Sequence, residues 1–255
     1  MAEWTDNLYW WKPRPRLGFI PRVDNLGDAL SPFIVKQVLS QVSPPVEPKP
    51  SQRRILAIGS ILNHAKTGDI VWGSGVNGIK AREDHAFESL DVRAVRGPRT
   101  RAFLDDLGIE CPEVFGDPGI LLSRFVKPRT PKLGDELYVP HFSQGRHERA
   151  DMRTLLTQGS DFQAFVNGIA SARIVYSASL HGLVIAESYG IPAILTMTST
   201  TENLFKYRDY YEGTGRDAFA VANSVEEAQS LSPPPLPDVG SIQDRLLKAF
   251  PLDAW

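Results

Sequence analysis

Four arginines lie within nine residues, in the stretch Arg93-Ala-Val-Arg96-Gly-Pro-Arg99-Thr-Arg101. The pattern places them where a strand passes into a helix, and the unpaired N–H groups of a helix N-terminus favour an anion. Guanidinium groups add paired donors that match a carboxylate or a phosphate. Arg96 and Arg99 flank the turn, so we expect them to converge on a bound anion. The spacing equally allows a surface cluster that pairs with nearby carboxylates.

A histidine lies at a second predicted strand-to-helix junction, in Ser177-Ala-Ser179-Leu180-His181-Gly182. One of the two serines is expected to cap the helix, which puts His181 in the first turn. An imidazole there binds an anion when protonated, or acts as a general acid or base. Spacing alone favours a structural histidine, whereas the small neighbours Ser179 and Gly182 favour an accessible one. Both interpretations stay open at this point.

A carboxylate stands at the start of the first long predicted helix, in Asn25-Leu-Gly27-Asp28. Asp28 is either the helix N-cap or a carboxylate that faces a cleft between two domains, with Asn25 and Gly27 forming a tight turn beside it. A similar short loop, Gly73-Ser74-Gly75, follows a predicted strand, but three small residues alone are weak evidence of a site. The candidates for lining the cleft are Asn25, Gly27, Ser74, Gly75 and His141.

Other kinds of site are excluded by what the sequence lacks. The five histidines show no metal-ligand spacing, and the chain has neither a GxxxxGK[ST] phosphate loop nor a GxSxG nucleophile motif, so we expect no bound metal. A single cysteine, Cys111, allows no internal disulfide and no zinc site built from thiolates. With 28 Lys and Arg against 30 Asp and Glu, the net charge of −2 gives no overall basic field for nucleic acid.

The elements that position these residues alternate between strand and helix along 255 residues, of which 42% are hydrophobic. Short apolar runs typical of buried strands are followed by stretches with helical spacing of apolar residues. In the first half, the expected strands are 17–20, 55–58, 70–72, 90–95 and 113–115, and the expected helices are 29–42 and 98–107.

The same alternation continues after a polar segment with two prolines, Arg124–Gly134, which we interpret as a linker. The expected strands are 136–142, 173–176 and 191–197, and the expected helices are 148–157, 162–170, 180–189, 202–211, one beginning at Ser224, and 242–250. Alternation on both sides of a linker indicates an α/β fold with two Rossmann-like domains, residues 1–130 and 131–255, facing a cleft. The last helix is free to pack back on the N-terminal domain.

The N-terminal sequence has no continuous apolar segment and no small-residue cleavage site, and no stretch approaches about 18 apolar residues. We therefore expect a cytoplasmic protein without a signal peptide or a membrane-spanning helix. The aromatic run Tyr9-Trp10-Trp11, beside Lys12, is expected to pack on the core rather than to lie at a membrane surface.

Several stretches, in this order, resemble the polysaccharide pyruvyl transferase family: NLGDAL, WGSGV, DVRAVRGPRTRAFLDDLGI with EVFGDPGILL, SASLHGLVIAESYGIPAI, and KYRDYYEGTG. Within the family, the chain is most similar to the short ketal pyruvate transferases of bacterial exopolysaccharide clusters, of the xanthan and succinoglycan type. The resemblance runs from Asn25 to Gly215, and motif order over that length is more specific than any single motif.

The resemblance implies a two-domain arrangement like that of the GT-B glycosyltransferases, with the active site in the cleft. Such enzymes take pyruvate from phosphoenolpyruvate and place it as a ketal across two hydroxyls of a sugar, releasing phosphate, without a further cofactor. The acceptor is an oligosaccharide carried on a polyprenyl lipid, so transient contact with the inner face of the cytoplasmic membrane is expected. By their positions in the matching motifs, Arg96 and His181 are the residues that the resemblance implies as ligands of phosphoenolpyruvate.

One position departs from the family pattern, because many members have an arginine before Leu-His-Gly and this chain has Ser179. Either Ser179 and the backbone hold the anion, or Arg99 or Arg208 replaces the missing arginine. The predicted phosphoenolpyruvate site is therefore Arg96, Arg99, Ser179, Leu180, His181 and Arg208. The resemblance and the residues together suggest His181 as an acid or phosphate partner and Asp28 as a base.

Two other functions compete with this interpretation. The stretch HGLVIAESYGIPAIL also resembles nucleotide-sugar glycosyltransferases of the GT-B type, whose retaining members pair a glutamate like Glu187 with another eight positions earlier. Here the earlier position is Ser179, which weakens this alternative. The third interpretation is a non-catalytic subunit of an exopolysaccharide assembly complex, which only the missing arginine supports.

Overall fold

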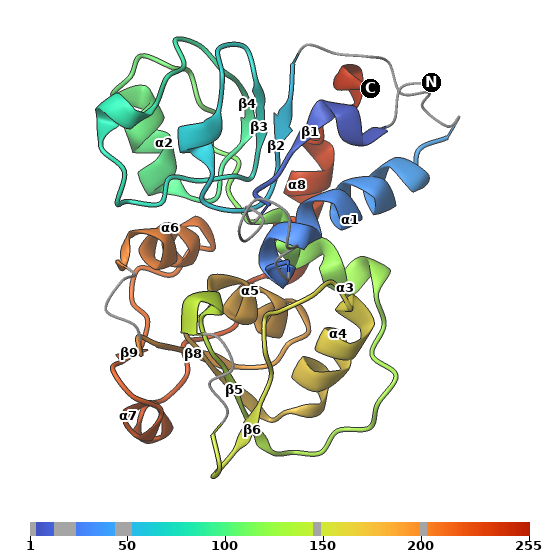
Figure 1. The fold of residues 1–255 in the computed structure, drawn as a ribbon, viewed down its shortest axis with the longest axis vertical. Coiled ribbons are helices and arrows are strands. Elements are labelled where there is room, and N and C mark those ends of the chain that lie inside the picture. The colour runs from blue at the N-terminus through green and yellow to red at the C-terminus, as the bar shows by residue number, and fades with distance from the viewer. Residues whose placement is uncertain (1–3, 13–23, 44–52, 145–148, 199–202) are drawn as a thin grey trace, which may run out of the picture.

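Two parallel β-sheets, with helices packed between and around them, form the protein in this computed structural model, which describes residues 4–12, 24–43, 53–144, 149–198 and 203–255 (Figure 1). The first sheet has the order β1-β2-β3-β4, with strands Leu8–Tyr9, Ile55–Leu56, Ile70–Trp72 and Asp91–Ala94. The second has the order β6-β5-β7-β8-β9, where β5 to β9 are Glu136–Val139, Arg153–Thr154, Ile174–Ser177, Ala193–Thr196 and Val221–Ala222. The predicted mixed α/β fold with parallel sheets is confirmed.

The central strands are mostly apolar and buried because helices or loops cover both faces. All three residues of β3 are buried, and so are all four residues of β8. In the first sheet, Ile55 of β2 is in register with Ile70 of β3, which is in register with Asp91 of β4. Parallel pairing places the carboxyl ends of neighbouring strands at the same sheet edge, so the loops that follow them lie together.

Eight α-helices occur in the described residues, and five of the helix starts have a side-chain cap. Asn25, Asp161, Ser179, Ser224 and Asp238 each accept a hydrogen bond from a backbone N–H in the following turn, as N-caps do. The helices are α1 Leu26–Ser40, α2 Pro98–Asp105, α3 Leu122–Phe125, α4 Phe162–Ser171, α5 Leu180–Ser188, α6 Phe205–Gly213, α7 Val225–Ser230 and α8 Val239–Lys248. Short 3₁₀ helices are η1 Trp4–Asn7, η2 Leu62–His64, η3 Arg82–Asp84, η4 Pro118–Leu121, η5 Phe142–Gln144 and η6 Leu252–Ala254.

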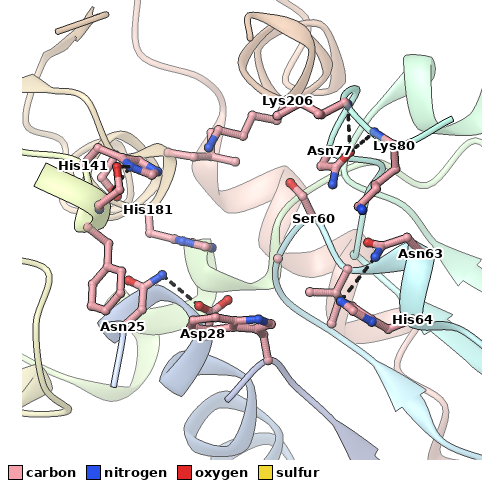
Figure 2. Close-up of a pocket in the computed structure, with 18 residues that line it drawn as sticks. Asn25, Asp28, Ser60, Asn63, His64, Asn77, Lys80, His141, His181 and Lys206 are labelled. Atoms are coloured by element: carbon pink, nitrogen blue, oxygen red, sulfur yellow. Dashed lines mark hydrogen bonds between the residues drawn. The ribbon is translucent and has the colours of Figure 1, made fainter. Parts of the chain in front are cut away.

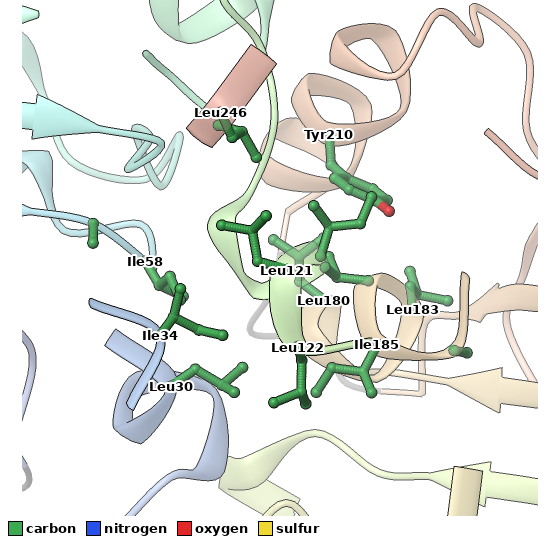
Figure 3. Close-up of a cluster of buried hydrophobic side chains, with 14 of the residues drawn as sticks. Leu30, Ile34, Ile58, Leu121, Leu122, Leu180, Leu183, Ile185, Tyr210 and Leu246 are labelled. Atoms are coloured by element: carbon green, nitrogen blue, oxygen red, sulfur yellow. The ribbon is translucent and has the colours of Figure 1, made fainter. Parts of the chain in front are cut away.

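A single hydrophobic cluster joins the two sheets (Figure 3). It includes Ile70 from the first sheet and Val175 from the second, together with residues of the helices that lie between them. Figure 3 shows Leu30 of α1, Leu183 of α5 and other side chains of this cluster meeting between the two halves. The helices α1 and α5 therefore fix the position of each sheet relative to the other, and both carry candidate site residues at their N-termini.

The C-terminal segment returns to the first sheet after the second sheet is complete. Trp72 of β3 donates a hydrogen bond from Nε1 to the carbonyl oxygen of Leu246 in α8 at 2.8 Å. Its ring also packs edge-on against Phe250 at 4.9 Å between ring centroids. Residues 127–134, which precede the second sheet, are exposed. The division into domains 1–130 and 131–255 stays a prediction, because the hydrophobic cluster that joins the two sheets contains residues from both sides of that limit.

Several elements differ from the sequence-based expectations. The helix expected over 148–157 is wrong: residues Arg153–Thr154 form the edge strand β6, because pairing with β5 satisfies their backbone groups. The strand expected at 113–115 is reduced to an isolated bridge between Val95 and Phe115. The short strands β1 and β9 were not expected, and the predicted strand 17–20 lies outside the described residues. Tyr9, Trp10 and Trp11 do pack against the hydrophobic clusters, as expected.

Candidate active site

A cavity of about 440 Å³ lies where the carboxyl ends of strands from both sheets meet. Its walls come from the loops that follow β1, β2 and β3 in the first sheet and β5 and β7 in the second, together with the starts of α1 and α6. That is the place where open parallel sheets bind ligands. The lining residues are Trp11, Asn25, Asp28, Gly59, Ser60, Ile61, Asn63, His64, Asn77, Ile79, Lys80, His141, Phe142, Ser143, Ser179, Leu180, His181 and Lys206.

His181 enters this cavity from the first turn of α5. Ser179 is the N-cap of that helix and accepts a hydrogen bond from the backbone N–H of Gly182, at 3.4 Å. The His181 side chain is 11% exposed, and its Nε2 lies 3.6 Å from Oδ2 of Asp117. Gly27 of α1 allows this position, because a Cβ added there would lie 2.0 Å from Nδ1 of His181.

Asp28 faces the same cavity from the first turn of α1 and lies below His181 in the view of Figure 2. It is not the helix cap, since that role belongs to Asn25, whose Nδ2 donates a hydrogen bond to Asp28 at 2.8 Å. Burial raises the pKa of the Asp28 carboxyl above its ordinary value, while the nearby His181 and Lys206 lower it in part. A carboxyl with a raised pKa is suited to proton transfer.

The opposite wall carries cationic and amide groups. Figure 2 shows His181 and Asp28 on one side of the cavity, and Ser60, Asn63, His64 and Lys80 on the other. Lys206, the second residue of α6, extends across the cavity in the same view. Two lysines near a histidine give the cavity a positive charge that suits an anionic ligand, and the surrounding amides and hydroxyls suit a polyol.

Arg96, predicted as an anion ligand, lies behind the cavity wall instead of in it. Its side chain is fully buried and donates from Nε to Oδ2 of Asp209 at 3.0 Å. One terminal nitrogen donates to Oγ of Ser60 at 2.6 Å, and the other donates to the carbonyl oxygen of Val76 at 2.5 Å. The guanidinium therefore touches the cavity only through Ser60.

Arg99 and Arg208 are not placed at the cavity with His181 either. Arg99 pairs with Glu212 of α6 at 2.6 Å, and Arg208 is exposed. Both line a separate cavity of about 330 Å³ on the other side of α6. The predicted convergence of Arg96 and Arg99 on an anion is therefore not what the structure shows, because α6 presents a carboxylate to each of them.

The predicted cleft residues divide into two groups. Asn25 and His141 line the cavity, and Gly27 lies directly beneath His181. Ser74 is buried and donates its hydroxyl to the carbonyl oxygen of Gly59, at 2.9 Å. Gly75 is needed for packing, because a Cβ added there would lie 2.5 Å from Cζ of Arg96. Ser74 and Gly75 thus support the wall and do not face the ligand.

The sequence analysis missed several residues that the structure brings to the site. Asp117 belongs to the turn Gly116-Asp117-Pro118-Gly119, which has the pattern of a helix cap, and only its contact with His181 marks it as part of the site. Ser60 follows β2 in a Gly-Ser turn, a signal that was available. Lys80 belongs to none of the stretches that carry the family resemblance. Lys206 is the first residue of one of them, KYRDYYEGTG, but nothing in that stretch marked the lysine as a site residue.

Glu187, the glutamate on which the glycosyltransferase alternative rests, is buried and paired with other side chains. It is 1% exposed and forms an ion pair with Arg216 at 2.6 Å, and it accepts a hydrogen bond from the hydroxyl of Tyr210 at 2.7 Å. It does not line the cavity that contains His181. The structure therefore gives no support to a sugar-nucleotide role for this residue.

In the part of the chain that the structure describes, no group of three or more His, Cys, Asp or Glu side chains is arranged to hold a metal ion. None of the described helices is long and apolar enough to cross a membrane.

Comparison with known proteins identifies relatives. A family model described as polysaccharide pyruvyl transferase matches residues 25–199. An uncharacterized protein of Acanthamoeba polyphaga mimivirus is 27% identical over 185 residues, which cover 64% of this chain and 61% of that protein. The succinoglycan biosynthesis protein ExoV of Rhizobium meliloti (strain 1021) is 24% identical over 176 residues, or 63% of this chain and 54% of that protein. The matched part therefore spans less than two thirds of either relative. The family match includes Asp28, Asp117 and His181.

Proposed function

The chain belongs to the polysaccharide pyruvyl transferase family, and we propose that it transfers pyruvate from phosphoenolpyruvate to two hydroxyls of one sugar, forming a ketal and releasing phosphate. The observation that carries the proposal is the cavity at the meeting of the two sheets. It combines a histidine and a carboxyl that can exchange protons with two lysines that can bind an anion. In its arrangement of two facing sheets, the protein is proposed to resemble the GT-B enzymes.

The donor has the charge that the cavity complements. Phosphoenolpyruvate carries a phosphate and a carboxylate on adjacent atoms, and Lys80 and Lys206 face the space in which these groups would lie. The N-terminus of α5, capped by Ser179, adds the positive end of a helix dipole at the same place. This set replaces the arginines expected from the family pattern, since Arg96 and Arg99 are already paired with carboxylates.

The reaction requires two proton transfers within reach of the bound donor. The vinyl carbon takes up a proton, the central carbon forms C–O bonds to two sugar hydroxyls, and its bond to the phosphate oxygen breaks. The two hydroxyl protons end on the new methyl group and on the departing phosphate, so atoms and charges balance. His181 and Asp28 are the titratable pair that we assign to these transfers, His181 as the acid and Asp28 as the base.

The acceptor is proposed to be a sugar of an exopolysaccharide repeat unit, because the relative from Rhizobium meliloti is named for succinoglycan biosynthesis. A cavity of about 440 Å³ lies in the range of small-ligand sites and leaves room for a donor and a sugar ring. A lipid-linked oligosaccharide would extend outside it, which implies cytoplasmic placement with transient contact at the inner membrane face.

Calorimetric titration with phosphoenolpyruvate tests donor binding. We expect Lys206→Ala to weaken binding about tenfold or more, because it removes a cation from the site, and we expect exposed Lys248→Ala to leave it unchanged. A preference for nucleotide sugars over phosphoenolpyruvate would refute the proposal in favour of the glycosyltransferase alternative.

Product analysis tests the reaction itself. The protein is incubated with phosphoenolpyruvate labelled with ¹³C at the central carbon and with oligosaccharide repeat units. A ketal carbon resonance that appears in step with phosphate release supports the proposal. Phosphate release without a ketal shows hydrolysis and contradicts it.

A further inference from the structure

Two buried polar atoms face each other at the base of the candidate active site. Nε2 of His181 and Oδ2 of Asp117 are 3.6 Å apart, and neither has a hydrogen-bond partner. Asp117 is 1% exposed, so water does not replace the missing partner easily. Buried polar atoms are nearly always paired, and an approach of about 0.5 Å would make this a hydrogen bond of ordinary length.

The rest of the Asp117 side chain is already fixed. Its Oδ1 accepts a hydrogen bond from the backbone N–H of Gly119 at 2.8 Å, which makes Asp117 the cap of η4. Oδ2 is thereby held toward the ring of His181. A carboxylate oxygen can only accept a hydrogen bond, so pairing requires that the proton of His181 resides on Nε2.

We propose that Asp117 is a positioning residue that holds His181 in the Nε2–H tautomer and stabilises its protonated form. The other ring nitrogen, Nδ1, lies against Gly27 in the first turn of α1, beside the carboxyl of Asp28. Nδ1 is then the nitrogen that exchanges protons on the cavity side. The identity of the groups that exchange protons with Nδ1 rests on the proposed pyruvyl transfer. The assignment of the tautomer does not depend on that proposal.

The proton cycle that follows is balanced. Asp28, the proposed base, takes a proton from a sugar hydroxyl and passes it to Nδ1 of neutral His181, which becomes an imidazolium whose charge the ionised Asp117 offsets. His181 then gives that proton to the vinyl carbon of the donor and returns to the Nε2–H tautomer. Asp117 itself stays ionised throughout, as the orienting carboxylate of a histidine does in catalytic triads.

Four groups from different elements act on the charge of this imidazole. Asp117 precedes η4, Asp28 belongs to α1, Lys206 belongs to α6, and His141 follows β5 and lines the same cavity. The two carboxylates favour the protonated ring, whereas Lys206 and a protonated His141 oppose it. Removing Asp117 removes the one carboxylate that faces Nε2.

¹⁵N NMR of protein labelled at histidine tests the inference without any substrate. The Nδ1 and Nε2 shifts report the tautomer directly, and His181→Gln identifies the signals of His181 among the five histidines. We expect the Nε2–H tautomer in the wild type. In Asp117→Asn, the new amide donates to Nε2, so we expect the Nδ1–H tautomer.

Asp28→Asn is the matched control, because it removes the other carboxylate near the ring. It is expected to keep the Nε2–H tautomer, because Asp117 still accepts from Nε2. Asparagine at 117 still accepts the Gly119 hydrogen bond, so η4 keeps its cap and the variant is expected to fold. A wild-type Nδ1–H tautomer, or an unchanged tautomer in Asp117→Asn, overturns the inference. Failure to bind phosphoenolpyruvate would refute the proposed function and leave this result intact.

Discussion

The buried ion pair between Arg96 and Asp209 is expected to contribute more to stability than any other single contact between α6 and the first sheet. Both side chains are fully buried, and Asp209 also accepts hydrogen bonds from the backbone N–H and the hydroxyl of Thr100, at 2.9 and 2.7 Å. Helix α6 packs closely against the turn that contains Gly97, because a Cβ added at Gly97 would lie 1.7 Å from the carbonyl oxygen of Asp209. The structure therefore leaves little room for water to solvate an unpaired guanidinium.

The substitution Asp209→Asn removes the charge and keeps the size of the side chain. Arg96 would remain charged and buried without a counter-ion, and breaking a buried pair in this way costs about 3–5 kcal/mol. The pair Arg99–Glu212 provides the control, since it joins α2 to the same helix α6 but its side chains are 38% and 21% exposed. Glu212→Gln is therefore expected to cost at most about 1 kcal/mol.

Equilibrium unfolding in urea at neutral pH, with thermal unfolding in parallel, measures the two losses. At about 2–4 °C per kcal/mol for a chain of this size, we expect Asp209→Asn to lower Tm by about 6 °C or more and Glu212→Gln by no more than about 4 °C. A loss below about 1 kcal/mol for Asp209→Asn, or equal losses for both variants, would refute the argument that burial determines the cost.

Three further predictions concern the site and the single thiol. Burial raises the folded-state pKa of Asp28 above 3.8, so the stability that the protonated carboxyl contributes is complete below that pH and is lost as the pH rises through the folded pKa. At about pH 7, the neutral variant Asp28→Asn is therefore expected to have a higher Tm than the wild type. An equal or lower Tm contradicts this. The added methyl group in Gly27→Ala displaces the imidazole of His181, so kcat for ketal formation is expected to fall about 100-fold. A wild-type kcat would show that the position of the ring is not critical. Burial raises the pKa of Cys111 to about 12, so its reaction with a disulfide reagent at about pH 8 is expected to be far slower in the native protein than in urea; equal rates would count against this burial.

Much of the local structure follows from short-range signals in the sequence. The strand β3 has the bounds expected from its apolar run, Ile70–Trp72, because a strand covered on both faces needs no alternation. The helix α2 begins at Pro98, and α5 begins after the cap Ser179, as proline and serine at those positions predict. The segment 148–157 fitted a helix equally well, and only the neighbouring strand β5 decided that part of it is a strand.

The chemistry of the arginine cluster could not be deduced from its spacing. Arg96 and Arg99 stand at a helix start, which is where anions bind, but the partners that occupy them come from α6, more than a hundred residues later. Asp209 and Glu212 belong to KYRDYYEGTG, a stretch that carries the family resemblance but does not show which residues its carboxylates contact. Nothing in the local pattern shows that this helix would pack across the strand-to-helix junction and neutralise it.

The sequence by itself determined the α/β class and the family, and it placed Asp28 and His181 at the starts of two helices, because each of these depends on periodicity, caps or motifs within a short stretch; both residues line the cavity. Only the tertiary structure decided that Asp117 faces the histidine and that two lysines complete the cavity. These groups come from loops and from the start of α6, which are tens of residues apart in the sequence, and parallel pairing brings the loops that follow the strands to one edge of a sheet. The packing of α1 and α5 between the two sheets then determines which of these side chains meet in the cavity.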